Sequence, residues 1–164
     1  MALSPYLRRL RDRVGHDLLQ LPSVAGLLRD SDGRVLLAHD VDTDRWVLPG
    51  GCVEPLERPA DALVRELQEE TGLVVRPVRV AAVLGGPEFT VRYRNGDEVS
   101  YVLTLFACEI AGGTLRPDGD EVAELRWVAP AELARLTLPR WAEIALPLVL
   151  ADGDRAAFEP PSAG

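Results

Sequence analysis

The sequence predicts an α/β fold in which helices sandwich a mixed β-sheet, an α/β/α arrangement. Three observations favour it. Short apolar runs with strand-like patterns recur along the chain, turn residues of hairpin type join several of them, and segments with helical periodicity separate them. Apolar residues make up 47% of the 164 residues, so the chain can bury one core, and its length suits a single domain.

The first element is expected to be a helix. Ser4 is typical of an N-cap and Pro5 of the first helical position. From Leu7, leucine and valine recur at helical spacing up to about Leu21, with arginine and aspartate on the other face. This N-terminal helix, assigned to residues 1–21, should pack against the rest of the domain or against a second subunit in a homodimer.

Strands and one further helix should follow. Two strands are predicted over residues 23–29 and 35–38, around a turn at 30–33. A polar loop precedes a short apolar segment at 46–48. The next helix should run over 59–71, with proline in its first turn and glycine directly after its end.

The second half of the chain predicts more strands and two short helices. A strand region at 73–84 is interrupted at Pro77, and the runs at 89–93 and 98–110 flank Asn95-Gly96, the strongest short hairpin signal. The remaining elements are a strand at 124–128, a short helix at 130–136 and a C-terminal helix at 138–150. The main domain is therefore placed at residues 22–151, followed by a flexible tail at 152–164.

Composition argues against several classes of protein. The net charge of −8 disfavours a nucleic-acid binder, although a small phosphorylated ligand held through a metal remains compatible with it. No apolar run approaches membrane-spanning length, and the N-terminus does not look like a secretory signal, so we expect a cytoplasmic protein. Two cysteines, Cys52 and Cys108, are too few for a disulfide framework or a structural zinc site.

The helix at 59–71 carries three glutamates that share one edge. At 100° per residue, Glu66, Glu69 and Glu70 fall within an arc of about 100°, beside the apolar stripe that the helix should bury. That stripe consists of Ala60, Leu63, Val64, Leu67 and Thr71. Like charges at this spacing repel one another. The pattern alone indicates either a solvated acidic face or a site for a hard cation such as Mg²⁺ or Mn²⁺.

The residues around this helix favour the cation site. Five residues separate Gly51 from Glu57, and seven more separate Glu57 from Arg65. From Arg65 the chain reads Arg65-Glu66-Leu67-Gln68-Glu69-Glu70-Thr71-Gly72-Leu73. These residues match every fixed position of the Nudix box. The chain therefore resembles a Nudix hydrolase, and the order of its predicted elements resembles that family over most of residues 22–150.

The resemblance implies a metal site. Glu66, Glu69 and Glu70 match the family's metal-ligand glutamates, and Gly50 matches the glycine whose carbonyl often adds a ligand. Mg²⁺ or Mn²⁺ is the implied cofactor.

The resemblance also assigns structural roles within the motif. Glu57 and Arg65 match the pair that usually bridges the loop and the helix, and Gly51 and Gly72 allow unusual backbone conformations. Many family members have glycine before the glutamate that Glu57 matches and serine or threonine after it. Here Leu56 and Arg58 stand there, so the helix start should be less well capped.

The base that takes a proton from the attacking water is open. Glu66 or Glu69 could serve, or a glutamate of the acidic loop before the last strand, where the family often has a ligand or the base. That loop contains Asp118, Asp120, Glu121 and Glu124. We select Glu121, although an ordinary acidic loop explains each of these residues equally well.

Residues for the group beyond the phosphates are weakly indicated. Trp46, Phe89, Tyr93 and Tyr101 could stack on a nucleobase, and core or hairpin packing is the alternative for each. The candidates for clamping a phosphate are Arg45, Arg92 and Arg94, and a solvated surface position is the alternative for each.

The predicted function is metal-dependent hydrolysis of a pyrophosphate linkage. The resemblance implies a small nucleotide-type substrate: a nucleoside diphosphate linked to another moiety, of the ADP-ribose or nucleotide-sugar type, or a nucleoside triphosphate. The alternative is a Nudix-like domain that senses a nucleotide without cleaving it. Such domains typically lose box glutamates, whereas this chain retains all of them.

Overall fold

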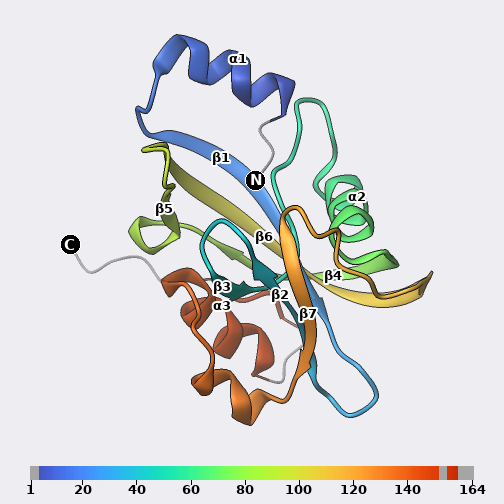
Figure 1. Cartoon of the computed structure of the whole chain (residues 1–164). Coiled ribbons are helices and arrows are strands. Elements are labelled where there is room, and N and C mark those ends of the chain that lie inside the picture. The colour runs from blue at the N-terminus through green and yellow to red at the C-terminus, as the bar shows by residue number, and fades with distance from the viewer. Residues whose placement is uncertain (1–3, 152–154, 159–164) are drawn as a thin grey trace.

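Seven strands lie among helices in the computed structural model, which describes residues 4–151 and 155–158 (Figure 1). The strands are β1 (Leu19–Leu28), β2 (Val35–Asp40), β3 (Arg45–Val47), β4 (Leu73–Leu84), β5 (Thr90–Arg92), β6 (Glu98–Gly113) and β7 (Val122–Val128). The helices are α1 (Pro5–Val14), α2 (Pro59–Thr71) and α3 (Arg140–Leu150), with 3₁₀ helices η1 (Pro87–Phe89) and η2 (Pro130–Arg135). Within the described residues, no helix has the length and apolar character needed to cross a membrane.

The strands form two sheets where the sequence predicted one. β1 pairs with β6 in parallel, while β4 and β5 pair with β6 antiparallel, so the four-stranded sheet is mixed, as predicted. β3, β2 and β7 form a separate antiparallel sheet. The long apolar runs of β1 and β2 are buried over most of their length because their side chains enter two different cores.

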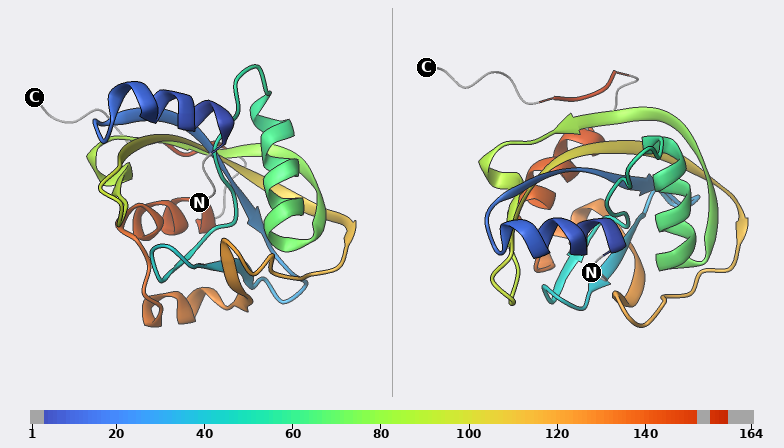
Figure 2. Two further views of the ribbon diagram at one scale, coloured as in Figure 1. Left: turned by 45° about the horizontal axis from the view of Figure 1, so that its top comes forward. Right: turned by 90° about the horizontal axis from the view of Figure 1, so that it is seen from above.

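These two cores confirm the α/β/α arrangement. Beneath α2, Leu63 and Leu67 pack with Leu36 of β2. Beneath α3, Leu146 packs with Leu37 of the same strand. Because successive strand side chains point to opposite faces, β2 separates the two cores. Figure 1 and the left view of Figure 2 show α2 and α3 on opposite sides of the strands.

Helix α2 has the bounds that the sequence predicts. Pro59 occupies its first turn, and Gly72 ends it in the left-handed conformation, at φ +70°. Arg58 at the N-cap makes no side-chain hydrogen bond, which confirms the expected weak cap. Leu56, which stands where the family often has glycine, takes φ +68° with a fully exposed side chain.

Replacing Arg58 by serine should stabilise the protein by about 1 kcal/mol. The Arg58 backbone already has the φ of −78° and ψ of 142° that suit an N-cap, so a serine hydroxyl can accept a hydrogen bond from the first turn of α2. Arg58→Ala, which removes the same charge without adding an acceptor, is the matched control. Denaturant unfolding at neutral pH measures both variants, and equal stabilities would contradict the prediction.

Helix α1 is shorter than predicted, because it ends at Val14 rather than near Leu21. Gly15 takes φ +59° after it, and from Leu19 the chain pairs with β6 over the whole of β1. Long-range strand pairing therefore outweighs the helical periodicity of these residues. Of the two predicted partners for this helix, the structure shows the domain itself, against which α1 packs through Leu7, its one buried side chain.

The hairpin at Asn95-Gly96 is confirmed. β5 and β6 pair antiparallel on either side of it, and Gly96 takes φ +92°. β4 runs through Pro77 without a break, although its register against β6 slips there because proline has no N–H to donate. The predicted short helix at 130–136 is a 3₁₀ helix.

The predicted tail at 152–164 lies mostly outside the described residues. Within its described part, Ala157 forms a bridge with Ala82 at the edge of β4. The Ala157 N–H donates to the Ala81 carbonyl (2.8 Å), and the Val83 N–H donates to the Ala157 carbonyl (3.0 Å). This segment therefore extends the sheet beyond β4.

Candidate active site

A loop after β3 runs against β1 and places two glycines beside α2. The Val24 N–H donates to the Gly51 carbonyl and the Gly26 N–H to the Pro49 carbonyl, both at 2.9 Å. Between these bonds, a Cβ added to Gly50 would lie 2.2 Å from the Val24 carbonyl oxygen, so no larger residue fits. The Gly50 carbonyl accepts no backbone hydrogen bond in the part of the chain that the structure describes.

The three glutamates of α2 have different surroundings. Glu70 is only 9% exposed, and its Oε2 accepts a hydrogen bond from the Gly50 N–H at 2.8 Å. Glu66 is half-buried against Gly51, where an added Cβ would lie 2.5 Å from the Glu66 carboxylate carbon. Glu69 is exposed. Glu66 and Glu70 thus face the glycine loop, and Glu69 lies toward solvent.

Buried negative charge accumulates at this loop. Burial raises the pKa of Glu66, and the hydrogen bond and charge of Arg65 oppose that effect only in part. Burial raises the pKa of Glu70 well above its usual range; the Gly50 N–H lowers it, while Glu66, Glu121 and Asp118 raise it further. Carboxylates in such surroundings gain stability when a cation binds.

Arg65 ties the loop to the helix. Its Nε and Nη2 donate to the two carboxylate oxygens of Glu57, each at 2.9 Å, and Nη2 also donates to the Cys52 carbonyl at 3.2 Å. Its Nη1 donates to Glu66 at 2.8 Å and to Glu69 at 3.4 Å. The structure therefore contains the Glu57–Arg65 bridge, in the bidentate geometry that a guanidinium fork allows. The hydrogen bond from Arg65 lowers the pKa of Glu57.

The chemistry of the site fits a hard divalent cation, although the candidate ligand side chains are not grouped around one position. Among residues 4–151 and 155–158, no three His, Cys, Asp or Glu side chains stand in a metal-holding arrangement. One reason is that Arg65 draws Glu66 and Glu69 toward itself. The donors are nevertheless oxygens of the kind Mg²⁺ and Mn²⁺ prefer. Glu66, Glu69, Glu70 and the Gly50 carbonyl could hold such an ion once the two glutamates turn away from Arg65.

One residue of the acidic loop before β7 reaches this site. Glu121 lines the same cavity as Glu66, Glu69 and Glu70, and its charge adds to those that raise the pKa of Glu66 and Glu70. The other acidic residues of the loop do not line the cavity. Asp118 instead accepts backbone hydrogen bonds that shape the loop. Glu124 lies within β7 itself, where it pairs with Arg126.

The cavity in front of the glutamates measures about 760 Å³, a size typical of small-molecule sites. Of the seven residues predicted to contact the substrate, six line it: Arg45, Phe89, Arg92, Tyr93, Arg94 and Tyr101. Several of them are also engaged in the fold. Arg45 donates to the Leu138 carbonyl at 3.0 Å, Phe89 is buried in the core beneath α3, and the Tyr93 hydroxyl lies 2.6 Å from that of Tyr101.

Trp46, the remaining candidate, does not line the cavity. Its ring is buried, with its centroid 4.9 Å from that of His39 on the neighbouring strand. Arg126 lies on β7, the other neighbour of β2, and its guanidinium carbon is 4.6 Å from the Trp46 ring centroid. The structure therefore places Trp46 in packing within the three-stranded sheet, and the expectation that it stacks on a substrate is not supported.

The cavity also has walls that no sequence signal indicated. Ser4 and Leu7 of the α1 region line one side, and Arg140 and Trp141 at the start of α3 line another part. The periodicity of α1 indicated packing alone, and the approach of α3 to the cavity depends on tertiary structure.

Known proteins resemble this chain in sequence over most of its length. The NUDIX domain family matches residues 19–149, well over half of the chain. A MutT-like protein of Streptomyces ambofaciens is 34% identical over 112 residues, which cover 68% of this chain and 66% of the relative. A putative 8-oxo-dGTP diphosphatase of Bacillus subtilis is 37% identical over 106 residues, which cover 65% of this chain and 64% of the relative.

The fold is also shared with solved structures. The crystal structure of a UDP-X diphosphatase superposes with a TM-score of 0.70 at 22% identity, covering 93% of this chain and 73% of the other. At that identity the likeness concerns the fold alone. The chain spans slightly less than two thirds of the length of the two sequence relatives.

Proposed function

The chain belongs to the NUDIX family, and on that premise we propose that it hydrolyses a pyrophosphate linkage with the help of Mg²⁺ or Mn²⁺. The substrate is a small nucleotide: a nucleoside diphosphate joined to a second group, as in ADP-ribose or a nucleotide sugar, or a nucleoside triphosphate. One observation carries the proposal. The buried Glu70 carboxylate is held on the Gly50 N–H, beside Glu66, in the wall of a cavity large enough for a nucleotide.

The reaction needs what these residues offer. Adjacent phosphates repel an incoming nucleophile, and a bound divalent cation would neutralise them and lower the pKa of a bound water. Glu66, Glu69, Glu70 and the Gly50 carbonyl would hold that cation, and the Arg65–Glu57 bridge fixes the helix against the loop. We assign proton removal from the attacking water to Glu121, which lines the same cavity from a separate segment. Glu66 and Glu69 are the alternative bases.

The names of the relatives support this reaction class without fixing the substrate. A putative diphosphatase is among the sequence relatives, and the compound in its name, 8-oxo-dGTP, is a nucleoside triphosphate. The net charge of −8 favours a small substrate over a nucleic-acid chain.

A substrate panel tests the proposal. The protein is incubated with nucleoside triphosphates, ADP-ribose and nucleotide sugars, each with Mg²⁺, with Mn²⁺ and with EDTA, and products are separated by ion-exchange chromatography. We expect at least one substrate to yield a nucleoside monophosphate with metal and none with EDTA. If the compounds bind but none is cleaved with either metal, the nucleotide-sensing alternative holds instead.

Replacing Arg65 by lysine should lower kcat/KM for the best substrate by about 10- to 100-fold. A lysine ammonium cannot reproduce the fork that bonds both Glu57 oxygens and the Cys52 carbonyl, so the loop and helix lose their register. The matched control is Arg76→Lys, because Arg76 forms an exposed ion pair with Glu109 and does not line the cavity. Equal kcat/KM for the two variants would show that the bidentate bridge is dispensable.

A further inference from the structure

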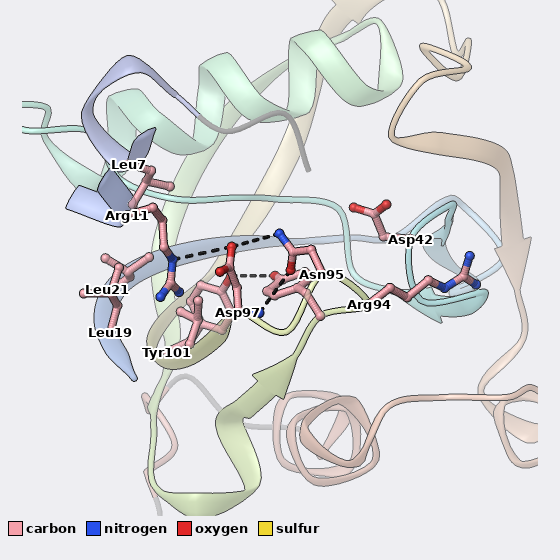
Figure 3. Close-up of a pocket in the computed structure, with 11 residues that line it drawn as sticks. Leu7, Arg11, Leu19, Leu21, Asp42, Arg94, Asn95, Asp97 and Tyr101 are labelled. Atoms are coloured by element: carbon pink, nitrogen blue, oxygen red, sulfur yellow. Dashed lines mark hydrogen bonds and ion pairs between the residues drawn. The ribbon is translucent and has the colours of Figure 1, made fainter. Parts of the chain in front are cut away.

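A second void lies beneath α1, next to the cavity of the proposed active site (Figure 3). It measures about 230 Å³. The two spaces share five lining residues: Leu7, Asp42, Tyr93, Arg94 and Tyr101. The void is therefore a side pocket of the cavity that contains the glutamates.

The walls of this side pocket are largely apolar and aromatic. They include Leu7, Leu19, Leu21, Val99, Tyr93 and Tyr101. These residues belong to a small core of their own, in which α1 takes part with a single buried side chain. The void is open to solvent rather than enclosed, so an apolar ligand that enters it would remove these walls from water.

A cluster of polar side chains ties α1 to the hairpin beside the void. The buried Asp97 carboxylate accepts a hydrogen bond from Asn95 (3.0 Å) and pairs with His16 Nδ1 (2.7 Å) and Arg11 Nε (3.5 Å). Arg11 also donates to the Glu98 carbonyl at 2.9 Å. Figure 3 shows Arg11, Asn95 and Asp97 of this cluster, joined by dashed lines. Because Arg11 balances the charge of Asp97, this end of the void suits an uncharged ligand better than a phosphate.

The aromatic wall can also donate a hydrogen bond. The hydroxyls of Tyr93 and Tyr101 lie 2.6 Å apart, so one of them donates a hydrogen bond to the other. The hydroxyl that accepts this bond keeps its own proton, which it can donate to a ligand.

Arg94 stands where the side pocket meets the main cavity. Five arginines line the main cavity, and four of them have partners. Arg45 bonds a carbonyl, Arg65 binds carboxylates, Arg92 pairs with Glu98 and Arg140 pairs with Glu143. Among the described residues, Arg94 alone of these five has no hydrogen bond or ion pair. In Figure 3 its side chain extends away from Leu19 and Leu21. It is available to a phosphate at this junction.

We propose that the side pocket beneath α1 binds the nucleobase of the substrate, and that Arg94 contacts the phosphate attached to that nucleoside. A nucleobase is flat, uncharged at neutral pH and carries hydrogen-bonding edges, which matches two tyrosine rings, an apolar floor and one available proton. A sugar presents hydroxyls on every side, and these apolar walls would leave most of them unpaired. This assignment rests on the proposed hydrolysis of a nucleotide and makes α1 part of the substrate site.

Binding without turnover tests the assignment separately from the reaction. Nucleoside 5′-monophosphates of the four common bases and ribose 5-phosphate are titrated into the ¹⁵N-labelled protein in EDTA, and amide shifts are followed by NMR. We expect at least one nucleotide to bind about tenfold more tightly than ribose 5-phosphate, as stacking of one base on aromatic side chains would give. Its shifts should include the amides of Leu7, Asn95 and Val99.

Two substitutions separate the base from the phosphate. Val99→Phe should fill the side pocket, so that the dissociation constant of the nucleotide comes to within twofold of that of ribose 5-phosphate. Val102→Phe should leave the tenfold difference unchanged. Val102 lies on the same strand, is exposed and lines neither space. Arg94→Ala should weaken the binding of both ligands about equally, and Arg76→Ala should weaken the binding of neither. Leu21→Phe fills the same pocket from β1 if Val99→Phe does not fold.

The outcomes distinguish the two proposals. Equal affinity of the nucleotides and ribose 5-phosphate, or a tenfold preference that survives both filling substitutions, would overturn the base subsite. Either result leaves pyrophosphate hydrolysis intact if the substrate panel shows turnover. Conversely, a protein that cleaves nothing can still show the base-dependent affinity.

Discussion

Glutamine at position 70 should reduce kcat/KM by at least about 100-fold while making the metal-free protein more stable. The activity should fall because an amide is a much poorer ligand than a carboxylate for a hard cation. The stability should rise because Glu70 is a buried carboxylate beside Glu66, and no described cation pairs with it. A glutamine oxygen can still accept the hydrogen bond from the Gly50 N–H. We expect a gain of about 1 kcal/mol, or roughly 2–4 °C in Tm.

Three measurements on one protein preparation test this pair of effects. Steady-state kinetics with Mg²⁺ gives kcat/KM, calorimetric titration of Mn²⁺ gives the metal affinity, and thermal unfolding in EDTA at neutral pH gives the Tm. Glu109→Gln is the matched control, because Glu109 is exposed and lines neither cavity. If the Glu70→Gln variant kept its activity, Glu70 would not be a ligand of the metal. A variant that loses activity and stability together would point to a structural role instead.

The sequence predicted those parts of the fold that local patterns determine. The bounds of α2, the glycine that ends it and the hairpin at Asn95-Gly96 all follow from residues close in sequence. The end of α1 was predicted wrongly. The helical periodicity continues to Leu21, but residues from Leu19 onward form β1 and pair with β6. The division into two sheets was also missed, since it depends on which strands meet rather than on their own patterns.

The same distinction applies to the site. The fixed spacing from Gly51 to Gly72 predicted which glutamates lie together, because one loop and one helix carry them all. Glu121 is brought to the cavity by the fold, and the spacing of acidic residues before β7 could not separate it from its neighbours. Trp46 and Leu7 show the limit most clearly. An aromatic residue of the right type packs inside the three-stranded sheet, and a leucine of the N-terminal helix lines the cavity.

Gly50→Ala should destabilise the protein by about 3–5 kcal/mol, the largest effect on stability that we expect from one methyl group. Gly50 has φ +150°, and its added Cβ would lie 2.2 Å from the Val24 carbonyl oxygen and 2.7 Å from the Ala25 Cα. Both atoms belong to the backbone of β1, which cannot move away because β1 pairs with β6 along its whole length. The loop itself is fixed on either side of Gly50 by hydrogen bonds to β1.

A second glycine separates the clash from the backbone strain. Gly119 has φ +84°, and nothing lies within 4 Å of the Cβ it would gain. Gly119→Ala should therefore cost only the left-handed conformation, about 1 kcal/mol. Urea unfolding of both variants gives the difference, and equal losses would show that β1 and the loop can separate. Gly50 also carries the carbonyl proposed as a metal ligand and the N–H that holds Glu70. The fraction of Gly50→Ala that remains folded should therefore bind Mn²⁺ more weakly than the wild type. Gly119→Ala should bind Mn²⁺ as the wild type does. Packing of the loop on β1 and ligation of the metal would then both require a glycine at position 50.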